Sequence, residues 1–418
     1  MSKPIWILKS GETVPTRADP SPRLMRSGQV FSELLDRGHR AVWWTSDFDH
    51  FKKAHWADAN SEMRHGELGR IVYCHGGAYC RNVSVRRLVH QWSVAKNFEA
   101  MAGREEEPSV IYAAFPTVEL AYSAVRHARK FGVRVVVDLR DMWPDIIPLH
   151  FGLLVRPLVR FALAPYFQRA RWVMRNADAL VGITEPFLSW GLGIAARPRS
   201  EGDAVIGFSY PRGGLSSGDL EEGTTFWRRL GVGVDSGVPV FAYSGSLGHS
   251  MDLSAILQAS ASLNVLGVSH QVVVCGIGER LGEYTRLAAG NKSIVFAGWV
   301  GRRDLAVLLS FAHAGFDVLP RRMDFMATIN NKAVEYLHFG VPVIVSPARS
   351  HLGVFVQAHG CGWAFDVDRD GDLAGVMQRA VAEGRSLRGA CRRVFDSHFS
   401  WDRTVGRFAD LLLGMARN

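Results

Sequence analysis

The chain has 418 residues, of which 47% are hydrophobic and 21% are charged, and its formal net charge is +9 at pH 7. This composition excludes a disordered chain, and the length exceeds what one core normally organises, so we expect two domains. The positive charge favours a nucleotide or a membrane headgroup as partner over nucleic acid, because the basic residues form no concentrated tail.

Five cysteines lie far apart in the sequence, and none forms a Cys-x-x-Cys pair: Cys74, Cys80, Cys275, Cys361 and Cys391. We expect free, mostly buried thiols in a reducing compartment. The apolar run at the N-terminus is too short for a signal peptide, and no stretch reaches the roughly 20 apolar residues of a membrane span. The sequence therefore predicts a cytoplasmic protein with at most peripheral contact at the inner face of the cell membrane.

Apolar strands alternate with helical patterns through the first 210 residues. The expected strands are 5–8, 41–45, 71–74, 110–113, 133–138 and 179–182, with helices such as 24–37 and 118–130 between them. Strands that are apolar along their whole length predict a parallel sheet covered by helices on both faces. We expect an α/β, doubly wound Rossmann-like domain over 1–210.

The loop after the first strand, 10–21, is long, and Ser21-Pro22 is a good helix start. Arg17, Arg23 and Arg26 could bind an anion there. A solvated loop fits the same residues equally well.

A charged and aromatic segment, 138–145, follows the fifth expected strand. It contains Asp138, Arg140, Asp141, Trp143 and Asp145. A carboxylate there could accept a proton or bind sugar hydroxyls, and Trp143 could stack on a sugar ring or a lipid. The alternative is an Asp–Arg pair that locks the loop, with Trp143 as a core residue. We favour a functional segment, because charge and aromaticity coincide at a strand end.

Residues 153–177 mix apolar and basic side chains. Arg156 and Arg160 are one helical turn apart, as are Arg171 and Arg175. Prolines at 157 and 165 predict two short helices rather than one. Contact with an anionic membrane is one interpretation, and core packing with exposed arginines is the simpler one.

A segment rich in Gly, Ser and charge, 211–236, predicts a linker. Further strands are expected at 239–244, 272–275, 293–297, 316–319 and 341–345, giving a second Rossmann-like domain over 211–399. The final helical segment, 400–418, could return to the first domain. Because ligands bind beyond the carboxyl ends of parallel strands, we expect a site in a cleft between the two sheets.

Two glycine-containing turns follow strands of the second domain. Gly245 and Ser246 come directly before a helix, an arrangement that suits a phosphate but is also a common strand–helix turn. Gly276-x-Gly278 has its third glycine one residue late for a dinucleotide fingerprint, so NAD binding is not expected. Arg280 could reach a diphosphate or be a solvated side chain.

A short helix ending at Gly340 carries the last candidate site. Lys332 and Glu335 lie three residues apart and share one face, so they could meet the phosphate and hydroxyl ends of a nucleotide sugar. Asn331 precedes them, and the loop before the helix supplies Arg321, for which surface charge is an equal alternative.

Calcium binding is not expected. Residues 366–372 imitate the start of an EF-hand loop, but Met377 occupies the position of the required glutamate. We expect a polar turn there, followed by a helix from Leu373.

In order along the chain, these motifs resemble those of family 4 glycosyltransferases of the GT-B fold, especially bacterial polysaccharide enzymes such as the L-fucosamine transferases of O-antigen assembly. The motifs are Leu35-Asp36-Arg37-Gly38-His39, Asp138-Leu139-Arg140-Asp141-Met142-Trp143-Pro144-Asp145, the Gly245 turn, Gly276-x-Gly278, and Asn331-Lys332-x-x-Glu335-Tyr336 with Gly340-x-Pro342.

The resemblance implies a retaining transfer from a nucleoside-diphosphate sugar, usually UDP-linked, to a lipid-linked glycan, without a metal or another cofactor. It assigns Glu335 to the ribose hydroxyls, Lys332 to the phosphates and the Gly245 turn to the diphosphate. Donor binding would also involve Ser246, Gly276, Gly278, Arg280, Arg321 and Asn331. The region of Asp138, Arg140 and Asp141 would be catalytic, and the acceptor side would include Trp143, Asp145, Arg17 and Arg23.

Two positions depart from the family pattern. Ala327 stands where the family has its first glutamate, and His249-Ser250-Met251 replaces an Arg–Lys pair after the Gly245 turn. Arg280, Arg321 or Lys332 would then have to neutralise the diphosphate. A nucleotide-sugar 2-epimerase and a weakened sugar-nucleotide-binding subunit are the alternatives.

Overall fold

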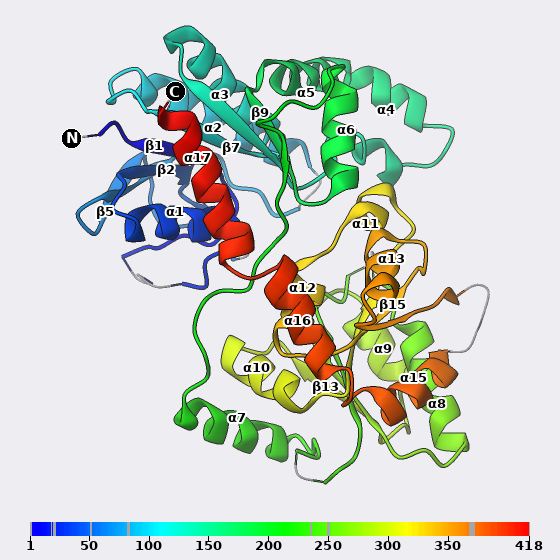
Figure 1. Cartoon of the computed structure of the whole chain (residues 1–418). Helices are drawn as coiled ribbons and strands as arrows, with labels where there is room; N and C mark the ends of the chain where they lie inside the picture. The colour runs from blue at the N-terminus through cyan, green and yellow to red at the C-terminus, as the bar shows by residue number, and fades with distance from the viewer. Residues whose placement is uncertain are drawn as a thin grey trace. The chain divides into compact units, whose positions relative to one another are not determined.

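The structure, a computed structural model, describes residues 2–17, 19, 22–50, 52–81, 84–234, 236–248, 251–367 and 373–417. The chain divides into two compact units (Figure 1). Unit 1 comprises Met1–Gly207 with Trp401–Asn418, and unit 2 comprises Phe208–Ser400.

Unit 1 is built on an eight-stranded sheet of order β10-β9-β8-β7-β1-β2-β6-β5. Its strands are β1 Ile5–Leu8, β2 Ala41–Ser46, β5 Ser61–His65, β6 Gly69–Cys74, β7 Val110–Phe115, β8 Arg134–Leu139, β9 Ala179–Gly182 and β10 Ala204–Val205. Strand β1 pairs in parallel with both β2 and β7, so the chain order reverses beside it. That reversal is the topological switch point, where open sheets of this type bind ligands.

Helices cover both faces of this sheet, because alternate strand residues point to opposite sides. Ile5 and Ile7 pack in a core with residues of α1 and α17, whereas Trp6 contacts Phe98 of α2 at a ring-centroid distance of 6.1 Å. The helices of unit 1 are α1 Arg26–Asp36, α2 Val85–Ala102, α3 Val118–Phe131, α4 Arg156–Ala162, α5 Ala164–Asn176, α6 Glu185–Ala195 and α17 Arg407–Arg417.

The last helix of the chain belongs to unit 1. A π-helical turn, η2 Asp402–Gly406, leads into α17, which packs on α1, β7 and β8 (Figure 1, red). Phe408 and Leu412 of α17 are fully buried in the same core as Ile7.

The expectation of a wholly parallel first sheet is wrong at one edge. Strand β5 pairs antiparallel with β6 through a tight turn containing Gly66, whose φ is +66°. Charged residues such as Glu62 and Arg64 make this strand suitable for an exposed edge. A two-stranded hairpin, β3 Phe48–Asp49 and β4 Ala54–His55, was also not predicted.

Unit 2 contains a parallel six-stranded sheet of order β13-β12-β11-β14-β15-β16. Its strands are β11 Val240–Ser244, β12 Gln271–Cys275, β13 Ile294–Gly298, β14 Ala314–Val318, β15 Val343–Ser346 and β16 Gly362–Ala364. Its switch point lies between β11 and β14.

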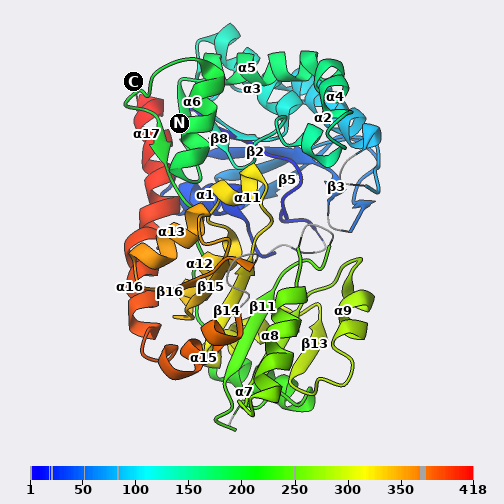
Figure 2. The ribbon, with the colours of Figure 1, turned by 90° about the vertical axis from the view of Figure 1, so that its right-hand side faces the viewer.

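The helices of unit 2 are α7 Ser217–Arg229, α8 Ser254–Val265, α9 Leu281–Leu287, α10 Arg302–Phe311, α11 Met323–Ala327, α12 Asn331–His338, α13 His351–Ala358, α15 Leu373–Glu383 and α16 Arg388–His398. Val240 and Ala242 of β11 pack in the core with α10, α12 and α16, whereas Phe241 and Tyr243 pack in the core with α8 and α15. Figure 2 shows α8 in front of the second sheet, close to β11.

Several predicted boundaries can be compared with the structure. The two short helices expected in 153–177 are confirmed as α4 and α5, and the helix from Leu373 is confirmed as α15. The predicted linker 211–236 is wrong in part, because Ser216 and Asp219 form a capping box that starts α7. Helix α1 begins at Arg26 rather than at Pro22, and Ser21 lies outside the described residues. None of the described helices has the length and apolar character that crossing a bilayer requires.

Candidate functional sites at the two switch points

The turn after β11 is fixed by its neighbouring loop. Gly245 has a φ of +155°, and its N–H donates to the Cys275 carbonyl over 2.9 Å. The Gly245 amide is therefore engaged within the fold, which leaves the neighbouring amide for the predicted contact with a diphosphate. The next amide, that of Ser246, has no hydrogen-bond partner within the described parts of the chain.

Gly276 and Gly278 allow this loop contact. A Cβ on Gly276 would lie 1.8 Å from the Gly245 carbonyl oxygen, and one on Gly278 would lie 2.4 Å from the Leu247 carbonyl carbon. Leu247 also donates to the Ile277 carbonyl over 3.0 Å. These glycines permit two backbones to pack closely and so hold the turn after β11 in a fixed conformation.

Helix α12 begins at a capped terminus and ends before Gly340, as predicted. Asn330 accepts a hydrogen bond from the Ala333 amide over 3.0 Å, and Gly340 has a φ of +70°. Asn331, the first residue of the helix, is exposed.

Lys332 is held by a buried carboxylate. Its Nζ lies 3.1 Å from Asp317 Oδ1 on β14 and 4.5 Å from the centre of the Tyr243 ring. Burial lowers the pKa of Lys332, but Asp317 more than offsets this and the pKa lies above its usual value. Lys332 therefore remains protonated at neutral pH. Its Cε would lie 3.5 Å from a Cβ on Gly245, which places its side chain beside the β11 turn.

Glu335 lies one turn further along α12. Only 7% of it is exposed, and the preceding turn carries Lys332 on the same helical face. Ala327, at the end of α11, is also buried, so no carboxylate stands at that position. Residues 249 and 250 lie outside the described residues.

The two arginines predicted to neutralise a diphosphate both have acidic neighbours. Arg280 donates to both Glu283 oxygens, over 2.9 and 2.8 Å, and lies 3.6 Å from Asp252. Arg321 is largely exposed, and its Nη2 lies 3.5 Å from Asp366. Arg322 forms a fork with Asp324 over 2.6 and 2.7 Å. These three arginines are therefore already paired with carboxylates of unit 2.

In unit 1, Asp138 and Arg140 belong to a buried ion network. Asp138 is fully buried and accepts hydrogen bonds from Arg26, Tyr112 and Arg140. Arg140 also contacts Glu12. Burial raises the pKa of Asp138, but the positive charges of Arg26 and Arg140 outweigh this effect and hold the pKa below its usual value. These contacts match the loop-locking alternative for Asp138 and Arg140, and they place Arg26 inside the fold instead of at an anion site.

The other predicted site residues of segment 138–145 make different contacts. Asp141 is half-buried and accepts from the Met142 amide over 2.8 Å. Trp143 is 7% exposed, and the Arg87 guanidinium lies 5.0 Å from its ring centre. Asp145 accepts from Trp190 Nε1 over 3.2 Å, and burial raises its pKa. Arg17 and Arg23 are exposed on the loop before α1.

A pocket of about 60 Å³ at the switch point of unit 1 was not predicted from the sequence. It is lined by Lys9, Ser10, Gly11, Phe48, His50, Tyr79, Arg87, His90, Gln91, Pro116 and Thr117. Lys9 follows β1 and Thr117 follows β7, so the pocket spans the reversal in strand order. The sequence did indicate an anion site in the loop after the first strand, but it assigned that site to Arg17, Arg23 and Arg26, whereas the pocket is lined by Lys9 and Arg87.

Lys9 gives this pocket a positive charge. Its ammonium group forms neither a hydrogen bond nor an ion pair with the residues that the structure describes. Burial, followed by the charge of Arg140, lowers the pKa of Lys9 to about 8. Burial also lowers the pKa values of His50 and His90 to about 4, so both imidazoles are neutral at pH 7. The pocket suits an anionic group.

A buried acid lies next to this pocket. Glu119, in the first turn of α3, is 7% exposed and accepts from the Tyr166 hydroxyl over 3.4 Å. Burial raises the pKa of Glu119 to about 7. Like Lys9, Glu119 therefore titrates close to neutral pH.

Helix α4 presents an exposed apolar surface, although apolar side chains normally turn inward. None of its residues is buried, and Phe161 is 82% exposed. Leu154, two residues before the helix, is 93% exposed. Arg160 is also largely exposed. The simpler expectation of core packing is wrong for α4, whereas α5 does contribute buried residues such as Val173.

A scan against protein-family models gives no match for this chain, and a search of curated proteins gives none either. Solved structures do resemble it. WaaG, a glycosyltransferase involved in lipopolysaccharide biosynthesis, has a TM-score of 0.65 at 13% identity, covering 98% of this chain and 100% of its own. HepE from Anabaena, in complex with UDP, has a TM-score of 0.64 at 14% identity with the same coverage.

A trehalose 6-phosphate synthase from Burkholderia multivorans has a TM-score of 0.64 at 14% identity, covering 100% of this chain and 98% of its own. These similarities extend over both Rossmann-like units, at sequence identities that establish the fold alone. The predicted fold class is thereby confirmed: the chain has the GT-B fold of glycosyltransferases.

Proposed function

We propose that the protein is a glycosyltransferase that moves a sugar from a UDP-linked donor to a lipid-linked glycan in bacterial surface polysaccharide synthesis. The observation that carries the proposal is the arrangement at the switch point of unit 2, where a glycine-braced turn lies beside Lys332 on α12. HepE, which shares the fold, binds UDP and UDP-glucose.

The donor diphosphate would meet backbone amides and Lys332. An ammonium group has three N–H donors, so the bond to Asp317 leaves Lys332 with two. The Ser246 amide would supply a further donor without any rearrangement of the turn. Glu335 would bind the ribose hydroxyls through its two oxygens. Because the arginines of this edge are paired with acids, Arg280 and Arg321 would contribute less than the sequence suggested.

The transfer would retain the anomeric configuration and need no metal. The acceptor oxygen would attack the anomeric carbon from the face that the diphosphate leaves, while the bond between that carbon and the phosphate oxygen breaks. The departing phosphate would take the acceptor proton. Asp141 is proposed to orient a hydroxyl, since Asp138 and Arg140 are occupied in the buried network. A product with inverted anomeric configuration would contradict this mechanism.

The acceptor is proposed to be anionic and membrane-bound. The pocket around Lys9 fits a phosphate of a lipid-linked glycan, and a phosphate there would supply the partner that the Lys9 ammonium lacks. The exposed apolar side chains and arginines of α4 suit the surface of an anionic bilayer. The protein would then act at the cytoplasmic face of the cell membrane.

The donor assignment is tested by calorimetry with UDP. We expect Glu335→Ala to weaken UDP binding by about 10-fold to 100-fold, since hydrogen bonds to a charged group contribute about 1.5–3 kcal/mol. Glu221→Ala, which removes an exposed carboxylate from α7, is the matched control and should bind UDP normally. Unchanged binding by Glu335→Ala would show that the donor site is misassigned.

Turnover is tested by nucleotide release from a panel of UDP- and GDP-sugars in the presence of a total lipid extract. Release that depends on the extract supports transfer. Tight UDP-sugar binding without release would favour a binding subunit, and conversion of the donor without any acceptor would favour a 2-epimerase.

Membrane contact is tested by sedimentation with vesicles containing anionic lipid. The double substitution Leu154→Ser/Phe161→Ser should reduce vesicle binding at least about 10-fold, because burial of each side chain contributes about 1.5–3 kcal/mol. Val265→Ser removes a side chain of unit 2 that is 88% exposed and serves as the control. Equal binding by all three proteins would overturn the membrane assignment.

A further inference from the structure

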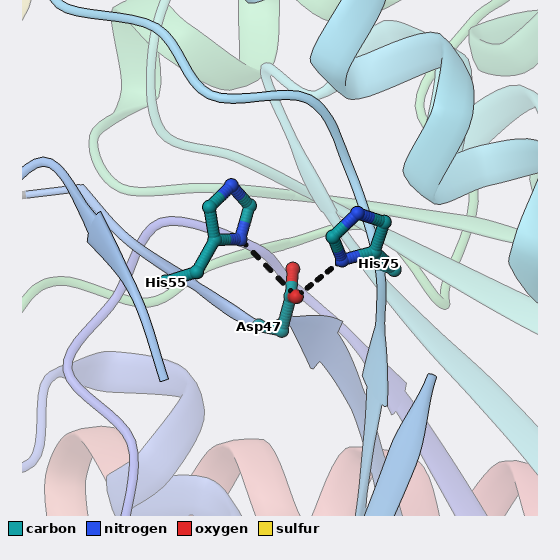
Figure 3. A group of neighbouring side chains, drawn as sticks. All are labelled: Asp47, His55 and His75. Carbon is teal, nitrogen blue, oxygen red and sulfur yellow. Dashed lines mark hydrogen bonds and ion pairs between the residues drawn. The ribbon is translucent and has the colours of Figure 1, made fainter. Parts of the chain in front are cut away.

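Three side chains with the chemistry of metal ligands converge at the carboxyl end of β2 and β6. They are Asp47, His55 and His75, and their nearest ligand atoms all lie within 4.8 Å of one another. Figure 3 shows both imidazole rings beside the Asp47 carboxylate. His75 Nδ1 lies 2.6 Å from Asp47 Oδ2, and His55 Nδ1 lies 3.1 Å from the same oxygen.

The backbone fixes this arrangement. Ser46 and Cys74 are register partners in parallel strands, so the next residues, Asp47 and His75, emerge side by side. The β3–β4 hairpin pairs Phe48 with His55 and so returns His55 to the same place. The Trp56 amide donates to the Asp47 carbonyl over 3.1 Å, which secures the hairpin next to β2. The three ligands therefore come from segments that are already ordered together.

Hydrogen bonds alone do not account for this cluster, because Asp47 and the Nδ1 atom of His55 are buried. Asp47 is fully buried, and its Oδ1 accepts from the Gly76 amide over 3.3 Å. His55 Nδ1 is shielded from solvent, and across the described residues it makes no hydrogen bond of acceptable geometry, although it lies close to Asp47. A buried ring nitrogen normally has a partner, and a bound metal ion would provide one.

We propose that Asp47, His55 and His75 bind one Zn²⁺ ion. Two imidazole nitrogens and one carboxylate oxygen are a donor set that zinc accepts, with a fourth position left for water. At bond lengths of about 2.0–2.1 Å, tetrahedral ligand atoms lie about 3.3 Å apart. The 3.1 Å between His55 Nδ1 and Asp47 Oδ2 is close to this separation, whereas His75 Nδ1, which forms a 2.6 Å hydrogen bond with the same oxygen, would have to move away from it to admit the ion. The side chains of His55 and His75 are 22% and 40% exposed, so an ion and a water molecule can reach the site from solvent.

Polar contacts around the ligands would support the bound state. The His75 amide donates to Asn60 Oδ1 over 2.7 Å, and the His75 carbonyl accepts from Asn97 over 2.8 Å. These bonds hold the backbone on which the imidazole is mounted. The ion would tie the hairpin to β6, and because Phe48 of that hairpin also lines the Lys9 pocket, it would stabilise one wall of the pocket. This role is separate from sugar transfer and does not depend on the proposed function.

The test uses the full-length, tag-free chain stripped with chelator and titrated with Zn²⁺ by calorimetry. We expect one ion per chain, with affinity lowered about 100-fold or more in His75→Ala and in His55→Ala. His39→Ala removes an imidazole from the same unit outside the cluster and should bind as the wild type does. Both half-exposed histidines can be replaced without emptying a buried position, and circular dichroism confirms folding.

A second measurement replaces Zn²⁺ with Co²⁺, whose visible absorption reports its ligands. A tetrahedral spectrum that is lost in Asp47→Asn and in His75→Ala supports the site. Failure to bind saturably would overturn the proposal, as would zinc binding that persists in His75→Ala but disappears in Cys80→Ser, where an exposed thiol is removed.

Discussion

The charged side chains at the two switch points differ in whether they have ion-pair partners within the fold. At the edge of unit 2, Lys332 and Arg280 are each held by a carboxylate of the fold, and glycines pack the neighbouring loops together. At the edge of unit 1, neither the Lys9 ammonium nor the buried Glu119 carboxyl group forms an ion pair with any residue that the structure describes. In unit 2 the ion pairs and packed loops fix the positions of the charged side chains before a ligand binds. In unit 1 the Lys9 ammonium can still pair with a bound anion.

The largest effect is expected from Lys332→Met, which tests the Lys332–Asp317 ion pair at the sheet edge of unit 2. It would leave Asp317 buried without a compensating charge, and we expect the free energy of unfolding to fall by about 3–5 kcal/mol in urea denaturation at pH 7. Adding Asp317→Asn to this variant should recover much of the loss, because no buried charge then remains. A loss under about 1 kcal/mol in the single variant would show that the pair does not hold this edge.

Gly276→Ala tests the loop packing. Its Cβ would overlap the Gly245 carbonyl oxygen, so the backbone must shift, and we expect about 3 kcal/mol of destabilisation together with weaker UDP binding. Gly282→Ala is the matched control, since a Cβ there meets no atom within 4 Å. Equal stability of the two variants would exclude close packing as the reason for the glycine.

Glu119→Gln tests the buried acid of unit 1. The pKa of Glu119 is raised from about 4.5 to about 7, so the folded state binds its proton more tightly than the unfolded state does. The wild type should therefore lose stability as pH rises from about 4.5 to 7, by up to about 3 kcal/mol, and then remain at that level.

The glutamine variant lacks this titration. At pH 8 it should be more stable than the wild type, and near pH 4 the two should be similar, as measured by urea unfolding across this range. Parallel pH profiles for the two proteins would contradict the burial of an uncompensated carboxyl group.

Lys9→Met tests the unsatisfied cation. Binding of inorganic diphosphate to the wild type should weaken as pH rises above about 8, because the Lys9 ammonium loses its proton. A bound anion favours the charged form, so the transition should move upward when diphosphate is present.

The methionine variant should bind diphosphate about 10-fold more weakly at pH 7 and without this pH dependence, a difference of about 1.4 kcal/mol in calorimetry. Lys52→Met, at an exposed position of the same unit, controls for the loss of net charge. Similar losses in both variants would mean that the pocket does not bind the anion.

The amino-acid pattern was sufficient for the two sheets and for α12. Apolar strands separated by helical patterns specify a doubly wound fold, because each strand is buried on both faces. Asn330 and Gly340 set the ends of α12 through local capping chemistry. The same local chemistry starts α7 at the capping box of Ser216, within the segment predicted to be a linker.

The ion-pair partners of the charged side chains could not be predicted from the local sequence, because they depend on which distant loops come together in the fold. Arg26 reaches Asp138 across 112 positions, and Lys332 reaches Asp317 from another element. These contacts turn predicted functional charges into internal ion pairs, since a buried charge needs a partner to offset its lost hydration.

The sequence by itself thus determined the central parallel strands of the two sheets, the order of their strand-end loops and the Lys332–Glu335 helix, because periodicity and capping are local properties. Tertiary structure decided which charges remain available. Only the folded sheets bring Lys9 to a pocket with Thr117, and only strand register and a hairpin unite Asp47, His55 and His75. Burial and long-range pairing set the electrostatics of each site, and neither is encoded in the spacing of residues along the chain.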